Sequence, residues 1–127
     1  MKLLIDTHAL IWFLEGSSSF SAKARRRIED ETNEKYVSVA SIWEMAIKIS
    51  IGKLRLDFAL PDLVRASAEE RIQVLSLEPA HAFAVTSLRR GRNDPFDRLL
   101  AAQALVEEMA VVSRDESFDA HRVRRIW

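Results

Sequence analysis

The sequence predicts an α/β fold, a single-domain three-layer α/β/α sandwich in which helices cover both faces of a mainly parallel central sheet. Short apolar runs with the length of buried strands alternate with stretches that carry helix start and stop residues, and this order is typical of a parallel sheet. A length of 127 residues suits one domain with a substantial core. Because no repeat, linker or low-complexity tract divides the chain, we expect a single domain over residues 1–127.

Two strands and three helices are expected in the first half of the chain. In order, they are a strand at 2–5, helices at 9–14 and 22–31, a strand at 36–39 and a helix at 41–51. Gly16 would end the first helix, and Ser21 is a suitable N-cap for the second. Ser41 and Glu44 form a capping-box pattern that would open the third helix, with Gly52 as its stop.

The second half is expected to continue the alternation. In order, it contains an alternating segment at 53–56, a helix at 61–70, a strand at 72–77, a helix at 79–88, a helix from 94–95 through 106, a strand at 110–112, a helical turn at 117–121 and an edge strand at 123–127. Pro61 and Pro79 suit the first turn of a helix, because proline has no N–H to leave unpaired there. Arg124 and Arg125 are typical of a protected edge strand.

The helix that begins at Asp94 and Pro95 carries the most informative acid. Asp94 suits the N-cap and Pro95 the first helical position, which puts Asp97 in the first turn near unpaired N–H groups. Residues 99–106 are apolar almost all round, so the helix is expected to be buried and to present Asp97 in a cleft. The alternative is that Asp97 only complements the helix dipole, which is worth about 0.3–1 kcal/mol.

Composition excludes several kinds of site and location. The chain has no cysteine, so a disulfide framework and a thiolate zinc site are both excluded. The apolar start at 3–5 is interrupted by Asp6 and His8, and no apolar run reaches the ~18 residues of a membrane span. These features predict a cytoplasmic protein. The formal net charge is zero, which gives no global field that would attract nucleic acid.

Positive charge is nevertheless gathered in three places. The clusters are Lys23, Arg25, Arg26 and Arg27; Arg89, Arg90 and Arg92; and Arg122, Arg124 and Arg125. Such local patches can hold a phosphate backbone even on a neutral protein. They can equally be solvated helix faces and ends, and the sequence does not decide between the two.

Four acids follow strands or begin helices at positions that share one edge of the predicted sheet. They are Asp6, Glu44, Asp97 and Asp115. Because the carboxyl ends of parallel strands meet at one edge, we expect all four side chains to face the same crevice. Neighbouring carboxylates raise one another's pKa unless a cation joins them, and an all-oxygen site suits Mg²⁺ or Mn²⁺. His8, His81 and His121 show no ligand spacing and are expected to be core or surface residues.

Four blocks of sequence carry a family resemblance and run from one end of the chain to the other. They lie at 4–12, at 41–48 with 52–54, at 94–104, and at 113–115 with Phe118. With these blocks in this order, the chain resembles the PIN-domain ribonucleases and is similar to the VapC toxins of bacterial toxin–antitoxin pairs. Family members often carry His-Arg just before the Asp-Pro pair, where this chain has Arg92 and Asn93.

The resemblance implies a PIN-like fold and a metal-dependent endoribonuclease that acts as the toxin of a toxin–antitoxin system. The acidic quartet of the family falls on Asp6, Glu44, Asp97 and Asp115, which would hold one or two Mg²⁺ or Mn²⁺ ions. Metal-activated water would then cleave RNA to leave a 5′-phosphate and a 3′-hydroxyl. Three residues are expected to support the site: Thr7 by orienting water, Asp94 as helix cap and neighbour of the quartet, and Ser113.

Two partners besides RNA are expected. A small cognate VapB-like antitoxin would lay a basic side chain into the acid cluster, because a guanidinium is a good substitute for a cation among carboxylates. A homodimer is predicted from the helix at 42–51, which has two apolar faces, and from the apolar helix at 9–14.

Other functions remain open from the sequence. A PIN-like nuclease could act on DNA or on structured nucleic acid, although the chain is small and has no room for a clamp insertion. A receiver-type signalling module would need two adjacent acids after the first strand, and here Thr7 follows Asp6. A haloacid-dehalogenase-type phosphotransferase would need an acid where His8 stands. A purely binding PIN domain would not need all four acids.

Overall fold

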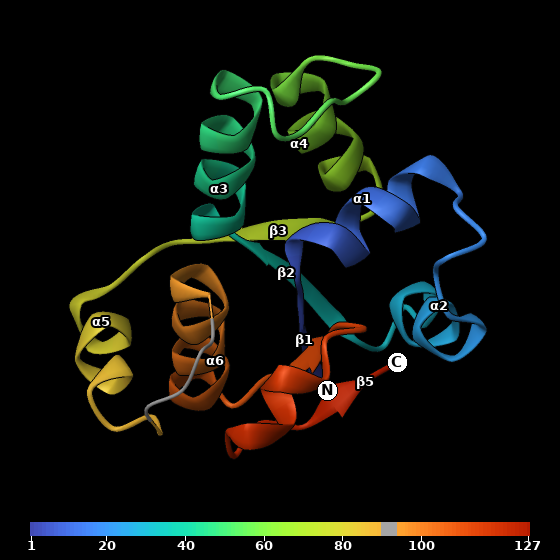
Figure 1. Cartoon of the computed structure of the whole chain (residues 1–127). Helices are drawn as coiled ribbons and strands as arrows, with labels where there is room; N and C mark the ends of the chain where they lie inside the picture. The colour runs from blue at the N-terminus through green and yellow to red at the C-terminus, as the bar shows by residue number, and fades with distance from the viewer. Residues whose placement is uncertain (90–93) are drawn as a thin grey trace.

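Five strands form one parallel sheet in the computed structural model, which describes residues 1–89 and 94–127. The strands are β1 (Lys2–Ile5), β2 (Glu34–Ser38), β3 (Ile72–Leu75), β4 (Ala110–Val112) and β5 (Arg125–Ile126). They lie in the order β3-β2-β1-β4-β5, and every neighbouring pair is parallel. The chain therefore winds outward in both directions from β1 (Figure 1). Ligands of open parallel sheets bind where the winding reverses, which is here between the carboxyl ends of β1 and β4.

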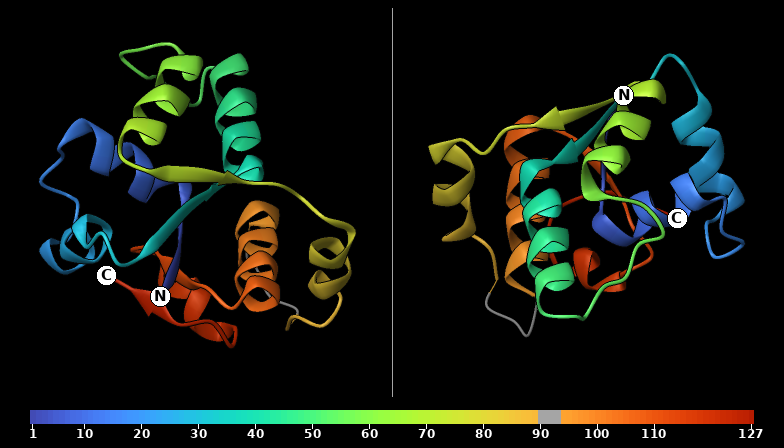
Figure 2. Two further views of the ribbon diagram at one scale, coloured as in Figure 1. Left: turned by 180° about the vertical axis from the view of Figure 1, so that it is seen from behind. Right: turned by 90° about the horizontal axis from the view of Figure 1, so that it is seen from above.

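Helices cover both faces of this sheet. They are α1 (Thr7–Glu15), α2 (Ala22–Glu29), α3 (Val39–Ser50), α4 (Leu60–Glu69), α5 (Pro79–Val85) and α6 (Pro95–Glu107), with a 3₁₀ turn η1 (Glu116–Ala120). The views of Figure 2 agree that α1–α4 lie on one side of the sheet and α5 and α6 on the other. This arrangement confirms the predicted α/β/α sandwich. Among the described residues, no helix has the length and apolar character needed to span a membrane.

The core has two parts because each central strand is buried on both faces. Leu3 and Ile5 of β1 pack with α1–α4, whereas Leu4 between them packs with α6 and η1. All three side chains are completely buried. Successive residues of a strand point to opposite faces, so a strand covered on both sides reads as a continuous apolar run rather than an alternating one.

Helix α6 is the most deeply buried helix segment of the second face. Five consecutive residues of this helix are buried: Leu100, Ala101, Ala102, Gln103 and Ala104. One side of α6 packs on the sheet and another on α5. The apolar character all round the helix thus reflects burial on more than one side, as predicted. Asp94 is the N-cap, accepting a hydrogen bond from the Phe96 N–H at 2.7 Å, and Pro95 is the first helical residue.

The N-cap of helix α3 lies three residues earlier than predicted, at Ser38 instead of Ser41. The Ser38 side chain accepts a hydrogen bond from the Ala40 N–H at 3.0 Å. Ser41 lies inside the first turns, where its buried hydroxyl has no hydrogen-bond partner among the residues that the structure describes. The capping box of Ser41 and Glu44 is therefore wrong. The helix starts earlier because β2 ends at Ser38, the last residue paired with β3, and the chain enters the helix directly after it.

Two alanine substitutions separate these capping roles. Ser38→Ala is expected to lower the free energy of unfolding by about 1 kcal/mol, because it removes the side-chain acceptor of an N-cap. Ser41→Ala is expected to be neutral or slightly stabilising, because the buried hydroxyl that it removes has no partner. Urea unfolding of the two variants measures both effects. A larger loss for Ser41→Ala than for Ser38→Ala would restore the capping box.

The edges of several other elements also differ from prediction. Helix α1 begins at Thr7 with Asp6 as its N-cap, and α5 ends at Val85. The edge strand is confirmed at β5, where the Arg125 side chain pairs with Asp119 at 2.9 Å. Arg90, Arg92 and Asn93 lie outside the described residues, so the basic cluster at 89–92 is placed only at Arg89, and position 93 is not placed at all.

Candidate active site

A pocket of about 550 Å³ opens at the point where the winding of the sheet reverses. All four acids that the sequence singles out contribute to its wall, together with the predicted supporting residues Thr7 and Asp94. The complete lining is Asp6, Thr7, His8, Trp12, Glu44, Lys48, Asp94, Asp97, Arg114, Asp115 and Glu116. These residues come from α1, α3, α6 and the segment after β4. The fold thus gathers in one cavity acids that are spread over most of the chain.

Asp6 is held rigidly at the carboxyl end of β1. As the N-cap of α1, its Oδ1 accepts a hydrogen bond from the Ala9 N–H at 2.8 Å. Its Oδ2 accepts a hydrogen bond from the hydroxyl of Ser113, which follows β4. Burial raises the pKa of the Asp6 carboxyl above its usual value, and the hydrogen bonds from Ser113 and Ala9 oppose that rise. The carboxylate is therefore fixed in orientation but not fully compensated in charge.

Glu44 is buried on α3, and both of its carboxylate oxygens have protein partners. Thr7 donates its hydroxyl proton to Oε1 at 2.6 Å, and the Lys48 ammonium donates to Oε2 at 2.7 Å. Glu44 therefore faces the pocket instead of capping its own helix. The pKa of Lys48 is raised, first by the hydrogen bond to Glu44 and with smaller contributions from Asp94 and Asp97. Lys48 is thus the internal counter-ion of this acid cluster.

Asp97 has the most perturbed carboxyl group of the site. Its pKa is raised to about 7, first by burial and then by the negative charges of four other acids. In decreasing order of effect, these acids are Asp94, Asp115, Asp6 and Glu44. Every other member of the predicted quartet therefore acts on Asp97. Such mutual repulsion arises only where carboxylates are crowded in a poorly solvated place, and it is common at functional sites.

Asp115 lies on the far wall of the pocket, at the start of η1. Its Oδ1 accepts a hydrogen bond from the Ser117 N–H at 2.9 Å, which makes it the N-cap of the turn. The Asp115 N–H donates to the hydroxyl oxygen of Ser113 at 3.0 Å. The fully buried Ser113 hydroxyl thus connects Asp6 and Asp115, by donating to one and accepting from the other.

Several pocket residues were not predicted from the sequence. Lys48 lies four residues after Glu44, a spacing that brings two side chains together on a helix and could have indicated it. Arg114 lies over the ring of Trp12 at 5.9 Å from its centroid, and this contact has no sequence signal. Of the three histidines, only His8 lines the pocket, while His81 and His121 are buried elsewhere.

The donor set fits a hard divalent cation. It offers carboxylate oxygens without thiolate or converging imidazole, and Asp97 is a carboxyl group that a cation would help to ionise. Within residues 1–89 and 94–127, no three acidic or histidine side chains lie close enough together to form a complete metal site. Each oxygen of Asp6 and of Glu44 accepts a hydrogen bond from a protein donor. A bound ion would share these oxygens with the donors or replace some of them, and Lys48 is the most exposed of the donors.

Comparison with solved structures shows the same fold in three bacterial complexes. VapBC2 from Rickettsia felis, bound to a DNA fragment from its promoter, is 14% identical with a TM-score of 0.74, and the match covers 98% of this chain and 97% of that chain. VapBC-1 from nontypeable Haemophilus influenzae is 15% identical with a TM-score of 0.65, covering 98% and 96%. FitAcB from Neisseria gonorrhoeae is 18% identical with a TM-score of 0.63, covering 97% and 95%.

Comparison by sequence gives the family. No curated protein is significantly similar to the chain. The model of the PIN domain matches residues 3–123, which is nearly the whole chain and includes Asp6, Glu44, Asp97 and Asp115. The sheet with its central winding reversal, the acid-lined pocket and this match agree with one another. The chain belongs to the PIN domain family.

Proposed function

We propose that this protein is a metal-dependent endoribonuclease and the toxin of a toxin–antitoxin system, built as one PIN domain over residues 1–127. The observation that carries the proposal is the crowding of four carboxylates around one pocket, where burial and like charge raise the pKa of Asp97 to about 7. Membership of the PIN domain family and the structural likeness to VapBC and FitAcB complexes support it. An RNA substrate would place the protein in the cytoplasm.

Asp6, Glu44, Asp97 and Asp115 are the residues that would hold Mg²⁺ or Mn²⁺. A divalent ion supplies Lewis acidity, which makes water a better nucleophile near neutral pH and offsets the charge of a phosphodiester. Ser113 keeps the Asp6 carboxylate in one orientation, and Thr7 does the same for Glu44. Lys48 and Arg114 on the pocket wall are the cations that would hold the phosphate oxygens of the substrate. Asp94 positions α6, and with it Asp97, as its N-cap.

A mixed-substrate cleavage assay tests this function. We expect cleavage of single-stranded RNA with Mg²⁺ or Mn²⁺ and none with EDTA, and the products should carry 5′-phosphate and 3′-hydroxyl ends. The alternative is a PIN-like nuclease that acts on DNA or on structured nucleic acid. Parallel reactions with single-stranded DNA, duplex DNA and hairpin RNA distinguish the two, because a preference for any DNA substrate would replace the RNA proposal.

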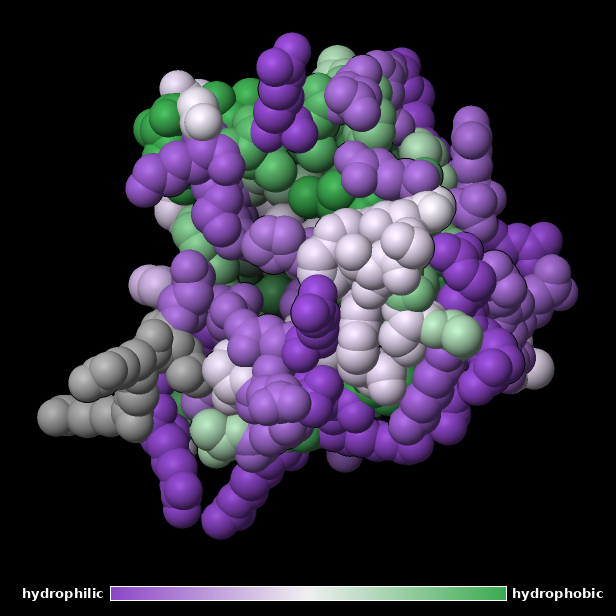
Figure 3. All heavy atoms as spheres, turned by 45° about the vertical axis from the view of Figure 1, so that its right-hand side comes forward, coloured by the Kyte–Doolittle hydropathy of each residue, from purple (hydrophilic) through white to green (hydrophobic). Residues whose placement is uncertain are grey.

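An antitoxin is the expected protein partner. The solved structures that resemble this chain are, by name, VapBC and FitAcB complexes. The structure offers an apolar groove of about 410 Å³ between α3 and the segment leading into α4. Figure 3 shows hydrophobic surface gathered over this upper region of the molecule. A small antitoxin could cover apolar surface of this kind while a basic side chain enters the acid pocket.

A homodimer is the other proposed assembly. Helix α3 and its C-cap residue expose large apolar side chains in the single chain: Val39 at 37%, Trp43 at 60%, Ile49 at 38% and, at the C-cap, Ile51 at 58% exposure. The Trp43 ring also packs edge-on against Phe96 at the start of α6, with 5.5 Å between ring centroids. Contiguous exposed apolar surface is typical of protein interfaces. Light scattering that shows a monomer at tens of micromolar would contradict the dimer.

Substituting Lys48 tests its place as counter-ion of the acid cluster. Lys48→Met is expected to tighten Mn²⁺ binding by about fivefold or more, because it removes a cation that competes for Glu44. The metal-free protein should lose about 1–3 kcal/mol of unfolding free energy, since a buried Glu44 oxygen loses its charged partner. Isothermal titration with Mn²⁺ measures the affinity. The exposed Lys53, just after α3, gives the control Lys53→Met. Equal Mn²⁺ affinity in both variants would show that Lys48 does not compete.

A further inference from the structure

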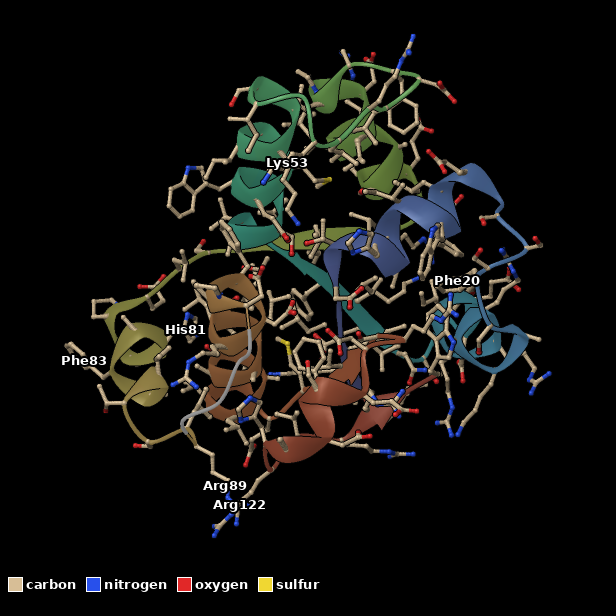
Figure 4. All side chains as sticks on the ribbon, viewed as in Figure 1. Phe20, Lys53, His81, Phe83, Arg89 and Arg122 are labelled. Carbon is tan, nitrogen blue, oxygen red and sulfur yellow. The ribbon has the colours of Figure 1, made fainter. Side chains whose placement is uncertain are left out.

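A second pocket, of about 580 Å³, lies between α6 and η1 and brings together two of the basic clusters of the sequence. Arg89, just after α5, lies on one side, and Arg122, just after η1, on the other. Leu88, Leu105 and Ala120 give it an apolar floor. Figure 4 shows the two arginine side chains extending to the same corner of the molecule. Residues separated by more than thirty positions in the chain thus share one cavity.

The charge of this pocket is positive in the part of the chain that the structure describes. Asp119 is its one acidic wall residue among those described, and both of its carboxylate oxygens accept hydrogen bonds from Arg125, at 2.9 and 3.0 Å. None of the ion pairs found within residues 1–89 and 94–127 involves Arg89 or Arg122. The backbone of Arg89 is itself fixed, because its carbonyl accepts a hydrogen bond from the Arg98 guanidinium at 2.7 Å. Two guanidinium groups are therefore available to an anion.

Two elements, α6 and η1 with its flanks, line both this second pocket, here called the basic pocket, and the pocket around Asp97, here called the acid pocket. Helix α6 contributes Asp97 to the acid pocket and Leu105 to the basic pocket, while η1 and its flanks contribute Asp115 to the first and Arg122 to the second. Eight residues of helix separate Asp97 from Leu105, which is about 12 Å along the axis. At about 3.4 Å per nucleotide for a stacked strand, and more for an extended one, this distance corresponds to at most about four nucleotides.

We infer that the basic pocket binds a backbone phosphate of the substrate RNA a few nucleotides away from the bond that is cleaved. The inference rests on the proposed ribonuclease function and adds a binding site to it. Paired arginines recognise phosphate oxygens well, and the apolar floor suits the face of a base or ribose. The site would hold the RNA strand along the α6–η1 seam, so that the acid pocket receives a defined phosphodiester.

Direct RNA binding tests the inference. Fluorescence anisotropy with a labelled single-stranded 12-nucleotide RNA, in EDTA so that no cleavage occurs, gives the Kd at several salt concentrations. Arg89→Ala and Arg122→Ala are each expected to raise the Kd by about five- to tenfold. Each should also lower the steepness of the logarithmic salt dependence by about 0.7, the value for one lost phosphate contact on a single strand.

Arg55→Ala is the matched control, because Arg55 is an exposed arginine in the segment between α3 and α4. If it weakens RNA binding as much as the two pocket variants do, only overall charge matters and the inference fails. Parent-like Kd values for Arg89→Ala and Arg122→Ala would also overturn it. A polyglutamate peptide serves as a second anionic probe: variants that lose binding to this peptide but keep binding to RNA would likewise overturn the inference. Cleavage assays run in parallel keep the two proposals apart. RNA binding that depends on both arginines without cleavage would refute only the nuclease, whereas cleavage without that dependence would refute only the basic pocket.

Discussion

Asp97→Asn is expected to lower RNA cleavage by orders of magnitude while making the metal-free protein more stable. The substitution removes one charge from a group of mutually repelling carboxylates and leaves the shape of the side chain unchanged. Because a pKa difference of one between folded and unfolded protein corresponds to about 1.4 kcal/mol, the gain at pH 8 should be at least about 1 kcal/mol. If Asp97 merely complemented the helix dipole, Asn would instead cost about 0.3–1 kcal/mol.

The gain should depend on pH in a defined direction. In the folded protein Asp97 keeps its proton up to about pH 7, whereas in the unfolded chain it loses the proton near its ordinary pKa of 3.8. Between these values the folded state binds more protons, so the stability of the parent falls as pH rises. The difference between variant and parent should therefore be largest above pH 7 and disappear below about pH 4. Urea unfolding in EDTA across this range measures it.

Metal addition gives the second half of the same test. Bound at a hundred times its Kd, an ion contributes roughly 2.7 kcal/mol to the stability of the parent, which is easily seen as a thermal shift. Asp97→Asn should lose most of that shift with Mn²⁺. Asp62→Asn, on the exposed first turn of α4, is the control, because it removes an acid at a similar helix position far from the pocket. A variant that is less stable in EDTA yet keeps its metal shift and its cleavage would refute the assignment of Asp97.

Leu100→Ala is expected to be the most destabilising simple substitution in the helix that presents Asp97. Leu100 is 1% exposed and packs in the core beneath α6. Truncating a leucine at such a position removes its buried surface and leaves a cavity, at a cost of about 2–5 kcal/mol. Since marginal proteins are stabilised by only about 5–15 kcal/mol, this loss should be large in urea or thermal unfolding.

Leu105→Ala on the same helix provides the control for this core substitution. Leu105 is 37% exposed, so its truncation removes a side chain that water already reaches. We expect it to cost about 1 kcal/mol or less, since hydrophobic stabilisation scales with the area removed from water. A similar loss in both variants would mean that α6 is not buried in solution as the structure has it.

The order of the elements and the meeting of the four acids could be predicted from the sequence because both follow from parallel topology. Once strands alternate with helices, their carboxyl ends must share an edge, and acids just after β1 and β4 must face it. The burial of residues 100–104 of α6 was equally predictable from the apolar stretch, whereas Leu105 and Val106 at its end are exposed. These features depend on patterns that extend over many residues, and no single residue can change them.

Local choices between similar residues were not predictable in the same way. Ser38 and Ser41 are both good N-caps by composition, and only the pairing of β2 with β3 decides that the strand ends at Ser38. With that boundary the capping alternative for Glu44 falls away, and this acid of the predicted quartet is the shared partner of Thr7 and Lys48. The contact between Arg114 and Trp12 likewise depends on how α1 packs beside β4, which no sequence pattern specifies.

The hydroxyl of Ser113 joins two segments that are synthesised far apart in time. It joins the segment after β4 to Asp6 across 107 positions of sequence, and β4 is also the partner of one edge of β1. Contacts between such distant positions form late, because a long loop must close before they can stabilise anything. A chain still on the ribosome, lacking β4, has neither Asp115 nor the group that orients Asp6. The acid pocket can therefore assemble only after residues 110–115 have been made.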